Sequence, residues 1–243
     1  MLKRIFFPVC LLFFSLIPTS CENIQSLGLT ETEIVSALRE ALSLGADSAS
    51  SQLSAVNGYY GNPVLKILLP ADAKSMIEKT YSIPGAQALL EPILATVVEK
   101  MNRGAEKAAV KAAPIFINAI TGMTVTDGLS ILKGSDSAAT AYLRSKTYSQ
   151  LSSAFAPEIN TAMDEVGAAT AWNSLFTKYN SYVNPLTQLT LGLQPINPNL
   201  GEYATGKALN GLFVKVADEE KVIRTDITKR TTELLRKVFA EQD

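Results

Sequence analysis

Histidine is absent from the 243 residues of this chain, and cysteine occurs only at Cys10 and Cys21. Without histidine, no serine–histidine or cysteine–histidine catalytic arrangement can form, and no imidazole can hold a metal ion. Acid–base chemistry would therefore depend on carboxylates, lysine or tyrosine. The sequence also lacks the spaced motifs of phosphate-binding loops, EF-hand loops and nucleophile elbows. From these absences we expect no metal site and no cofactor.

Charge and aromatic content are both modest. The chain has 22 basic and 23 acidic residues, which give a formal net charge of −1. Because nucleic-acid binding needs a clustered basic surface, we expect no nucleic-acid partner. Aromatic residues make up 7% of the chain, and no segment alternates apolar and polar residues convincingly over the length of a strand. These features favour closely packed helices over a β-sandwich.

The N-terminal segment has the anatomy of an export signal. Two basic residues precede an apolar stretch over residues 5–17, which is shorter than the roughly 20 residues of a membrane-spanning helix. Small residues then lead to Cys21, an arrangement that resembles the lipobox of bacterial lipoproteins. The pattern predicts a lipoprotein signal peptide at 1–20 and a lipid on Cys21, which would anchor the protein to a membrane on the periplasmic side of the bacterial cell envelope. An ordinary secretory signal cut nearby is the alternative.

The rest of the chain predicts a short tether over 21–29 and a single all-α domain over 30–243. Thr30 and Glu33 form a capping box, and apolar residues follow it at helical spacing. We expect a compact bundle of about eight to ten helices. These cover residues 30–56, 70–79, 94–120 with a kink at Pro114, 124–133, 137–146, 148–155, 157–166, 172–182, 209–217 and 227–239.

Two segments do not fit the helical pattern, and one helix is unusually rich in small residues. The apolar run Val64–Leu69 predicts a buried turn or short helix, although its length would also suit a strand. The stretch Asn184–Asn199 contains Gly192 and three prolines, so we expect an irregular loop or lid there. Small side chains from Gly104 to Ala112 indicate that a second helix lies close to this part of the chain.

One group of polar residues lies in the longest helical pattern. Asn102 and Glu106 are four residues apart, so they share a helix face. One interpretation is a buried polar site in which Glu106 acts as an acid or base and Arg103 holds an anion. The other is a polar network between helices, because such pairs are common on helices.

A second group of charged residues lies near the C-terminus. Glu220 and Arg224 are four residues apart, as are Asp226 and Arg230, and each pair runs acid before base. The carboxylates could ligate a hard metal ion, but the interleaved arginines favour salt bridges, worth about 0.3–0.5 kcal/mol per exposed pair.

Two isolated residues complete the set of binding candidates. Asp127 follows a possible helix cap at Thr124, and Lys207 follows Tyr203 within a helical pattern. Gly206, between Tyr203 and Lys207, predicts a close approach to another element.

Short motifs occur along the chain in a defined order: Asn102-Arg103-Gly104-Ala105-Glu106, Met123-Thr124 with Asp127, Ala139-Thr140 with Tyr142, Leu209-Asn210-Gly211-Leu212-Phe213, Glu219-Glu220, Ile223-Arg224 and Arg230-Thr231. Together they resemble the bacterial domain of unknown function 4197 over about residues 28–240. The resemblance implies an exported helical protein and no particular activity. In this family alanine is more usual at the positions of Gly104 and Gly128, and an aspartate is common at that of Asn210.

These observations lead to two hypotheses. The first is a non-enzymatic binding or scaffolding lipoprotein of the envelope, with an envelope protein or a small ligand as its partner. It predicts an apolar groove or an exposed apolar patch. The second is a carboxylate-based hydrolase or lyase acting on envelope material, with Glu106 as acid or base and with Arg103 and Arg224 orienting an anionic substrate. It predicts Glu106 in a concave pocket.

Overall fold

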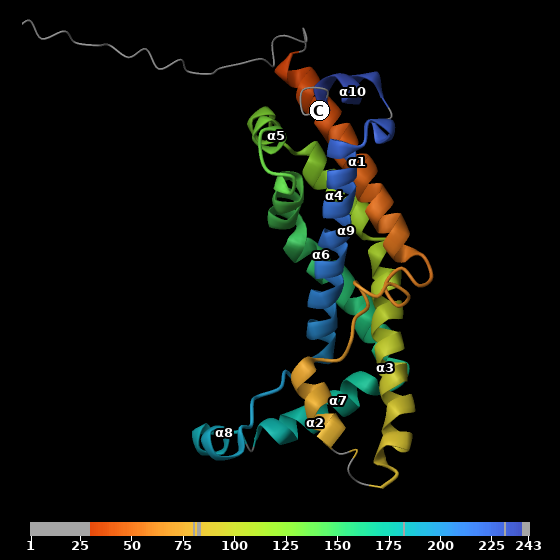
Figure 1. Cartoon of the computed structure of the whole chain (residues 1–243), viewed down its shortest axis with the longest axis vertical. Coiled ribbons are helices and arrows are strands. Elements are labelled where there is room, and N and C mark those ends of the chain that lie inside the picture. Colours follow the sequence, from red (N-terminus) through yellow and green to blue (C-terminus); the bar gives the residue numbers. More distant parts are fainter. Residues whose placement is uncertain (1–29, 80, 82–83, 182, 231, 240–243) are drawn as a thin grey trace, which may run out of the picture. The chain divides into compact units, whose positions relative to one another are not determined.

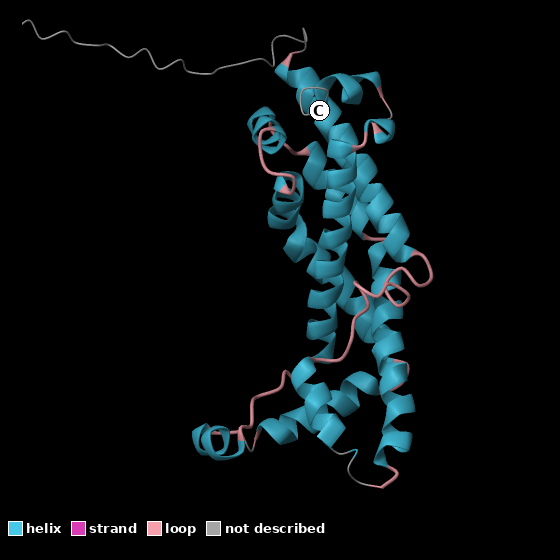
Figure 2. Ribbon diagram, in the orientation of Figure 1, coloured by secondary structure: helices cyan, strands magenta, loops and turns pink. Residues whose placement is uncertain are grey.

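A computed structural model describes residues 30–79, 81, 84–181, 183–230 and 232–239 (Figure 1). Over these residues it contains ten α-helices and no strand, which confirms the all-α prediction (Figure 2). The buried apolar side chains run from Ile34 to Val238, so a protein of residues 28–243 contains this whole core. The predicted signal peptide at 1–20, the lipid site Cys21 and the tether lie outside the described residues.

The helices are α1 (Glu31–Ser54), α2 (Ala71–Lys79), α3 (Ala86–Ala109), α4 (Ala112–Thr121), α5 (Val125–Leu132), α6 (Ala138–Asp164), α7 (Ala168–Asn180), α8 (Pro185–Leu191), α9 (Leu200–Thr225) and α10 (Glu233–Phe239). The most extensive contact joins α3 to α6, and α6 also lies along α9. Helix α1 packs against α9 and α4 and further contacts α5 and α10. The centre of the bundle is therefore made by its longest helices.

The close approach expected beside the small residues of α3 is present. A Cβ atom added to Gly104 would lie 2.7 Å from the Cα atom of Ile159 in α6 and 3.1 Å from the Cβ atom of Ala162. Ala105 and Ala108, beside Gly104, are completely buried. Small side chains thus let the backbones of α3 and α6 approach to a distance that larger residues would prevent.

The predicted kinked helix over 94–120 is two helices. The chain leaves the helical path at Val110 and Lys111, so Pro114 falls in the first turn of α4. Proline has no N–H to donate, and its ring clashes with the carbonyl four residues earlier, which here belongs to Val110. The first turn of a helix tolerates a proline, because the N–H groups there have no acceptor within the helix and the missing donor breaks no helical hydrogen bond.

In contrast, the three helices predicted between residues 137 and 166 are one continuous helix, α6, with Pro157 inside it. A proline inside a helix is unfavourable by about 3 kcal/mol. Leu151, Phe155 and Ile159 are nevertheless fully buried on either side of the proline. Burying each such side chain stabilises the fold by about 1.5–3 kcal/mol, which outweighs the loss.

The stretch predicted as an irregular loop, Asn184–Asn199, contains helix α8. The Asn184 side chain accepts hydrogen bonds from the N–H groups of Leu186 and Thr187, and Pro185 occupies the first turn. Gly192 ends the helix in a left-handed conformation with φ of 64°. The cap and the stop signal were both visible in the sequence, so the prediction of a wholly irregular segment was wrong.

The C-terminal helices also differ from the prediction in their bounds. Helix α9 begins at Leu200, where the Asn199 side chain caps it, and continues to Thr225. The helix predicted over 227–239 is divided into a short 3-10 helix, η3 (Ile227–Lys229), and α10. Within the described residues no single helix has the length and apolarity to cross a bilayer. Helices α4 and α5 reach that threshold only together, across a bend of 109°.

Candidate functional site

Asn102 binds the backbone of the segment that joins α1 to α2. Its Oδ1 accepts a hydrogen bond from the N–H of Ile67 at 2.8 Å, and its Nδ2 donates to the carbonyl of Ile67 at 2.8 Å. The segment Val64–Leu69, which begins in a turn and continues without regular structure, has no strand as a partner among the described residues. The amide of Asn102 supplies the donor and acceptor that a neighbouring strand would supply, and this explains its complete burial.

Glu106 holds the same segment one helical turn away. Its Oε1 accepts hydrogen bonds from the N–H groups of Tyr59 at 3.2 Å and Tyr60 at 3.0 Å, while Oε2 accepts from Nη1 of Arg103 at 2.7 Å. Burial raises the pKa of the Tyr59 hydroxyl, and the nearby negative charge of Glu106 raises it to a smaller extent. The hydrogen bond to Glu106 raises the pKa of Arg103. Both carboxylate oxygens are therefore bound to the protein itself, and Glu106 does not line any of the three cavities described below. These contacts argue against the hypothesis of Glu106 as an acid or base.

The contacts of Glu106 lead to a first prediction. Glu106→Gln is expected to lower the free energy of unfolding by about 1–2 kcal/mol, because the amide keeps one acceptor oxygen but loses the charge-assisted bond to Arg103. Urea denaturation measures the change. Glu99→Gln is the control, since Glu99 is exposed and lies 3.5 Å from Nε of the same arginine. Equal losses in the two variants would contradict the structural role of Glu106.

The second carboxylate, Glu220, caps a helix from outside. Ser137, at the start of α6, makes no side-chain cap. Instead Glu220 of α9 accepts hydrogen bonds from the N–H groups of Ala139 at 3.0 Å and Thr140 at 2.8 Å, and from Oγ1 of Thr140 at 2.7 Å. This arrangement satisfies two N–H groups that the first turn of α6 leaves free and places a negative charge at the positive end of the helix.

Arg224 completes this buried cluster. Its Nη2 lies 3.0 Å from Oε1 of Glu220 and donates to the carbonyl of Ile131 at 3.0 Å. The predicted salt bridge is therefore confirmed, but Glu220 and Arg224 are only 5% and 8% exposed, so the expectation of an exposed pair was wrong. Arg230, which is fully buried, donates to the carbonyls of Ile223 and Arg224. Asp226 and Arg230 do not form the predicted pair on one helix face, because α9 ends at Thr225, before both residues, and the Asp226 side chain caps η3.

The two remaining candidates lie apart from these clusters. Asp127 forms a capping box with Thr124 at the start of α5, and the hydroxyl and N–H of Thr124 lower the pKa of its carboxyl. Lys207 on α9 lies over the Tyr203 ring at 5.6 Å and borders a hollow of about 740 Å³ beside the segment 64–72. The predicted site residues that the structure describes thus lie at four separate places: the Glu106 cluster, the Glu220 cluster, the start of α5 and the hollow beside Lys207.

A groove with an almost wholly apolar lining lies between α2, α3 and α7, and we call it the apolar groove. Helices α2 and α7 lie beside the first half of α3 (Figure 1). The groove has a volume of about 490 Å³ and is open on one side. Its lining comprises Met76, Ile77, Leu90, Ile93, Leu94, Thr96, Val97, Val166, Gly167, Ala168, Ala171, Trp172 and Leu175. Only Thr96 and Trp172 among them have a side-chain oxygen or nitrogen, and the indole N–H is bound to the carbonyl of Asn197.

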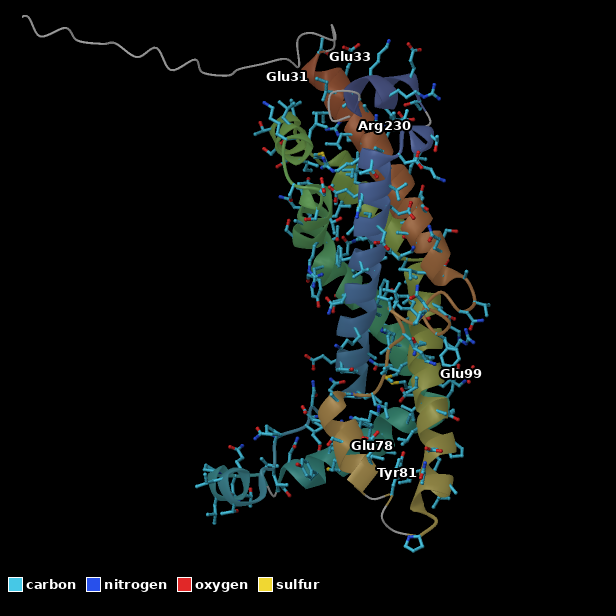
Figure 3. The ribbon with its side chains drawn as sticks, in the orientation of Figure 1. Glu31, Glu33, Glu78, Tyr81, Glu99 and Arg230 are labelled. Carbon is cyan, nitrogen blue, oxygen red and sulfur yellow. The ribbon has the colours of Figure 1, made fainter. Side chains whose placement is uncertain are left out.

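A smaller and more polar hollow adjoins the apolar groove. It measures about 270 Å³, and Ile77 and Leu94 line both cavities. Its border carries charged groups and phenol rings, among them Lys66, Lys74, Glu78, Tyr81 and Glu91. Figure 3 shows Glu78 and Tyr81 at the end of the bundle where α2 lies, and Arg230 near the opposite end.

Individual residues of the apolar groove were not identified from the sequence. The hypothesis of a binding protein predicted such a groove. One sequence signal was available on α3, where Leu90, Ile93, Leu94 and Val97 recur at i, i+3, i+4 and i+7 and all line the groove. The described residues contain no cluster of three acidic side chains that could hold a metal ion. The groove itself offers only the hydroxyl of Thr96 to a ligand, so it can bind apolar groups but provides no acid or base.

Comparison with known proteins adds one match. The family described as "Protein of unknown function (DUF4197)" matches residues 28–240, nearly all of the chain. No curated protein and no solved structure shows a significant match.

Proposed function

Because this chain belongs to the DUF4197 family, for which no function is named, we propose its function from the groove: it is a non-enzymatic binding protein that holds an acyl chain of a lipid or fatty acid. The observation that carries the proposal is the lining of the apolar groove, in which eleven of the thirteen residues have no side-chain nitrogen or oxygen. Transfer of a hydrocarbon chain into such a site gains roughly 0.8 kcal/mol per buried CH₂ group.

The dimensions and surroundings of the groove support a ligand of this class. Its volume of about 490 Å³ lies in the range of small-molecule sites, roughly 300–1,000 Å³. Ile93 and Leu175, which line it, are 55% and 52% exposed, so a bound chain would cover apolar surface that water now contacts. The adjoining hollow beyond Ile77 and Leu94 offers charged and hydroxyl groups to a polar head group.

The cellular setting of this binding protein is part of the same proposal. The export signal over 1–20 and the lipobox-like arrangement at Cys21 favour a lipid anchor on the periplasmic side of the bacterial envelope. A protein held at a membrane in this way meets acyl chains as its most abundant apolar ligand.

The experiment uses the protein of residues 28–243 and its single tryptophan, Trp172, which lines the groove. Equilibrium dialysis with radiolabelled palmitate measures affinity, and brominated stearate, which quenches indole fluorescence at contact, locates the chain. Saturable binding with quenching of Trp172 is expected. Ala171→Phe, which fills part of the groove from an exposed position, is expected to weaken binding about tenfold or more, equivalent to about 1.4 kcal/mol.

The matched control is Ala141→Phe, an exposed alanine of α6 outside the groove, which should bind palmitate as the unaltered protein does. Circular dichroism checks that all three proteins are folded. Absence of saturable binding, or equal weakening by both substitutions, would falsify the proposal.

A further inference from the structure

The chain between Lys178 and Glu202 contains no Asp, Glu, Lys or Arg, and it is the longest stretch of the sequence without a charged residue. It connects α7 to α9 and includes α8. A water-exposed connection in a protein with 19% charged residues usually carries several charges. Their absence here removes the main penalty for moving a surface segment out of water, which is the desolvation of charge.

Helix α8, within this stretch, presents leucines to solvent. Leu186 and Leu189 are three residues apart, so they share one helix face, and they are 68% and 86% exposed. The helix is well defined by its own ends: Asn184 caps the start, and Gly192 supplies the left-handed stop. Its leucines are therefore displayed on an ordered element.

The return segment after α8 is bound firmly to α7. Asn180 makes two hydrogen bonds to the backbone of Ile196: its Nδ2 donates to the carbonyl, and its Oδ1 accepts from the N–H at 2.9 Å. The Tyr179 hydroxyl donates to the carbonyl of Gln194 at 3.1 Å, and Nε1 of Trp172 donates to that of Asn197 at 3.3 Å. These bonds hold the base of the segment while the leucines of α8 remain exposed.

We infer that α8 docks the protein on the surface of a lipid bilayer, with Leu186 and Leu189 inserted among the acyl chains near the interface. A lipid surface accepts exposed apolar side chains and requires no complementary shape, and an uncharged segment enters it without the cost of desolvating a charge. A protein partner is less suited to α8, because stable interfaces bury roughly 800 Å² on each side and this helix has seven residues. The exposed leucine face also fits the way interfacial helices bind, with an apolar face just below the head groups.

Docking through α8 would bring the membrane close to the apolar groove, because α7 connects the two. Helix α7 carries Trp172, which lines the groove and also binds the segment that follows α8. Docking through α8 would therefore bring a lipid surface close to α7, one of the helices that form the groove. The inference goes beyond the proposed function and does not depend on it, because insertion of two leucines does not require an occupied groove.

Flotation of the protein of residues 28–243 with phosphatidylcholine vesicles tests the inference. Binding is expected, and it should change little between low and high salt, because the docking segment has no charge to be screened. The double variant Leu186→Gln/Leu189→Gln is expected to lose about 10- to 100-fold in partition coefficient, since it removes two apolar side chains from the interface. The control is Val56→Gln/Val64→Gln, two valines outside α8 that are each 80% exposed.

A second measurement reports insertion directly. The protein of residues 28–243 has no cysteine, so Leu189→Cys allows an environment-sensitive fluorophore to be attached on α8, and vesicles should shift its emission to shorter wavelength. Ala171→Phe should leave vesicle binding unchanged, which separates this inference from the acyl-chain proposal. Three results would each overturn it: no vesicle binding by the unaltered sequence, equal losses in the α8 and control variants, or no shift in the emission of the fluorophore attached on α8 when the protein is vesicle-bound.

Discussion

Glu220→Ala is expected to lower the free energy of unfolding by about 3–5 kcal/mol, the range for removing one partner of a buried ion pair. The change takes away the acceptor for the N–H groups of Ala139 and Thr140 at the start of α6. It also leaves the guanidinium of Arg224 buried without its carboxylate. Chemical denaturation followed by far-ultraviolet circular dichroism measures the loss.

The neighbouring residue provides the control for this prediction. Glu219 is half-buried and accepts a hydrogen bond from Nε2 of Gln52, so Glu219→Ala should cost no more than about 1 kcal/mol. The double variant Glu220→Ala/Arg224→Ala should lose less than the sum of the two single variants, because it leaves no unpaired charge. Similar losses at Glu219 and Glu220, or strict additivity, would show that the buried pair does not hold α6 to α9.

The second large effect is a difference in sign between two identical substitutions. Gly104→Ala is expected to destabilise the protein by about 1–3 kcal/mol, because the added Cβ would meet the Cα of Ile159 at 2.7 Å and the two helices would have to separate. Gly206→Ala on α9 is expected to stabilise it by about 0.5–1 kcal/mol, because alanine favours a helix interior and, apart from the adjoining backbone of α9 itself, no atom lies within 4 Å of the Cβ position.

Thermal unfolding of the two single variants distinguishes these outcomes without further controls, since each variant serves as the reference for the other. Stabilisation by both substitutions would mean that α3 and α6 are less closely packed than the structure shows. The close approach predicted from Gly206 was wrong, whereas that predicted from Gly104 was confirmed. Both glycines lie within helical patterns, and only the position of the neighbouring helix tells them apart.

The polar residues singled out from the sequence were located on the correct helix faces but interpreted only in part. The spacing of Asn102 and Glu106 showed that they share a face, and both are buried on α3. Their partners are backbone groups 35 and 47 residues away, at Ile67 and Tyr59. Helical spacing relates residues within one turn, so it carries no information on such distant partners.

The sequence by itself determined the helical class, through apolar periodicity and caps such as Thr124 with Asp127, and the lack of histidine excluded histidine-based catalysis. Those properties depend on local residue chemistry. Tertiary structure alone decided that Pro157 lies inside a continuous helix and that Glu220 caps α6. It also decided that α2, α3 and α7 leave an apolar groove between them. Each of these depends on which surfaces meet, because packing energy between distant segments exceeds the local preferences that a sequence displays.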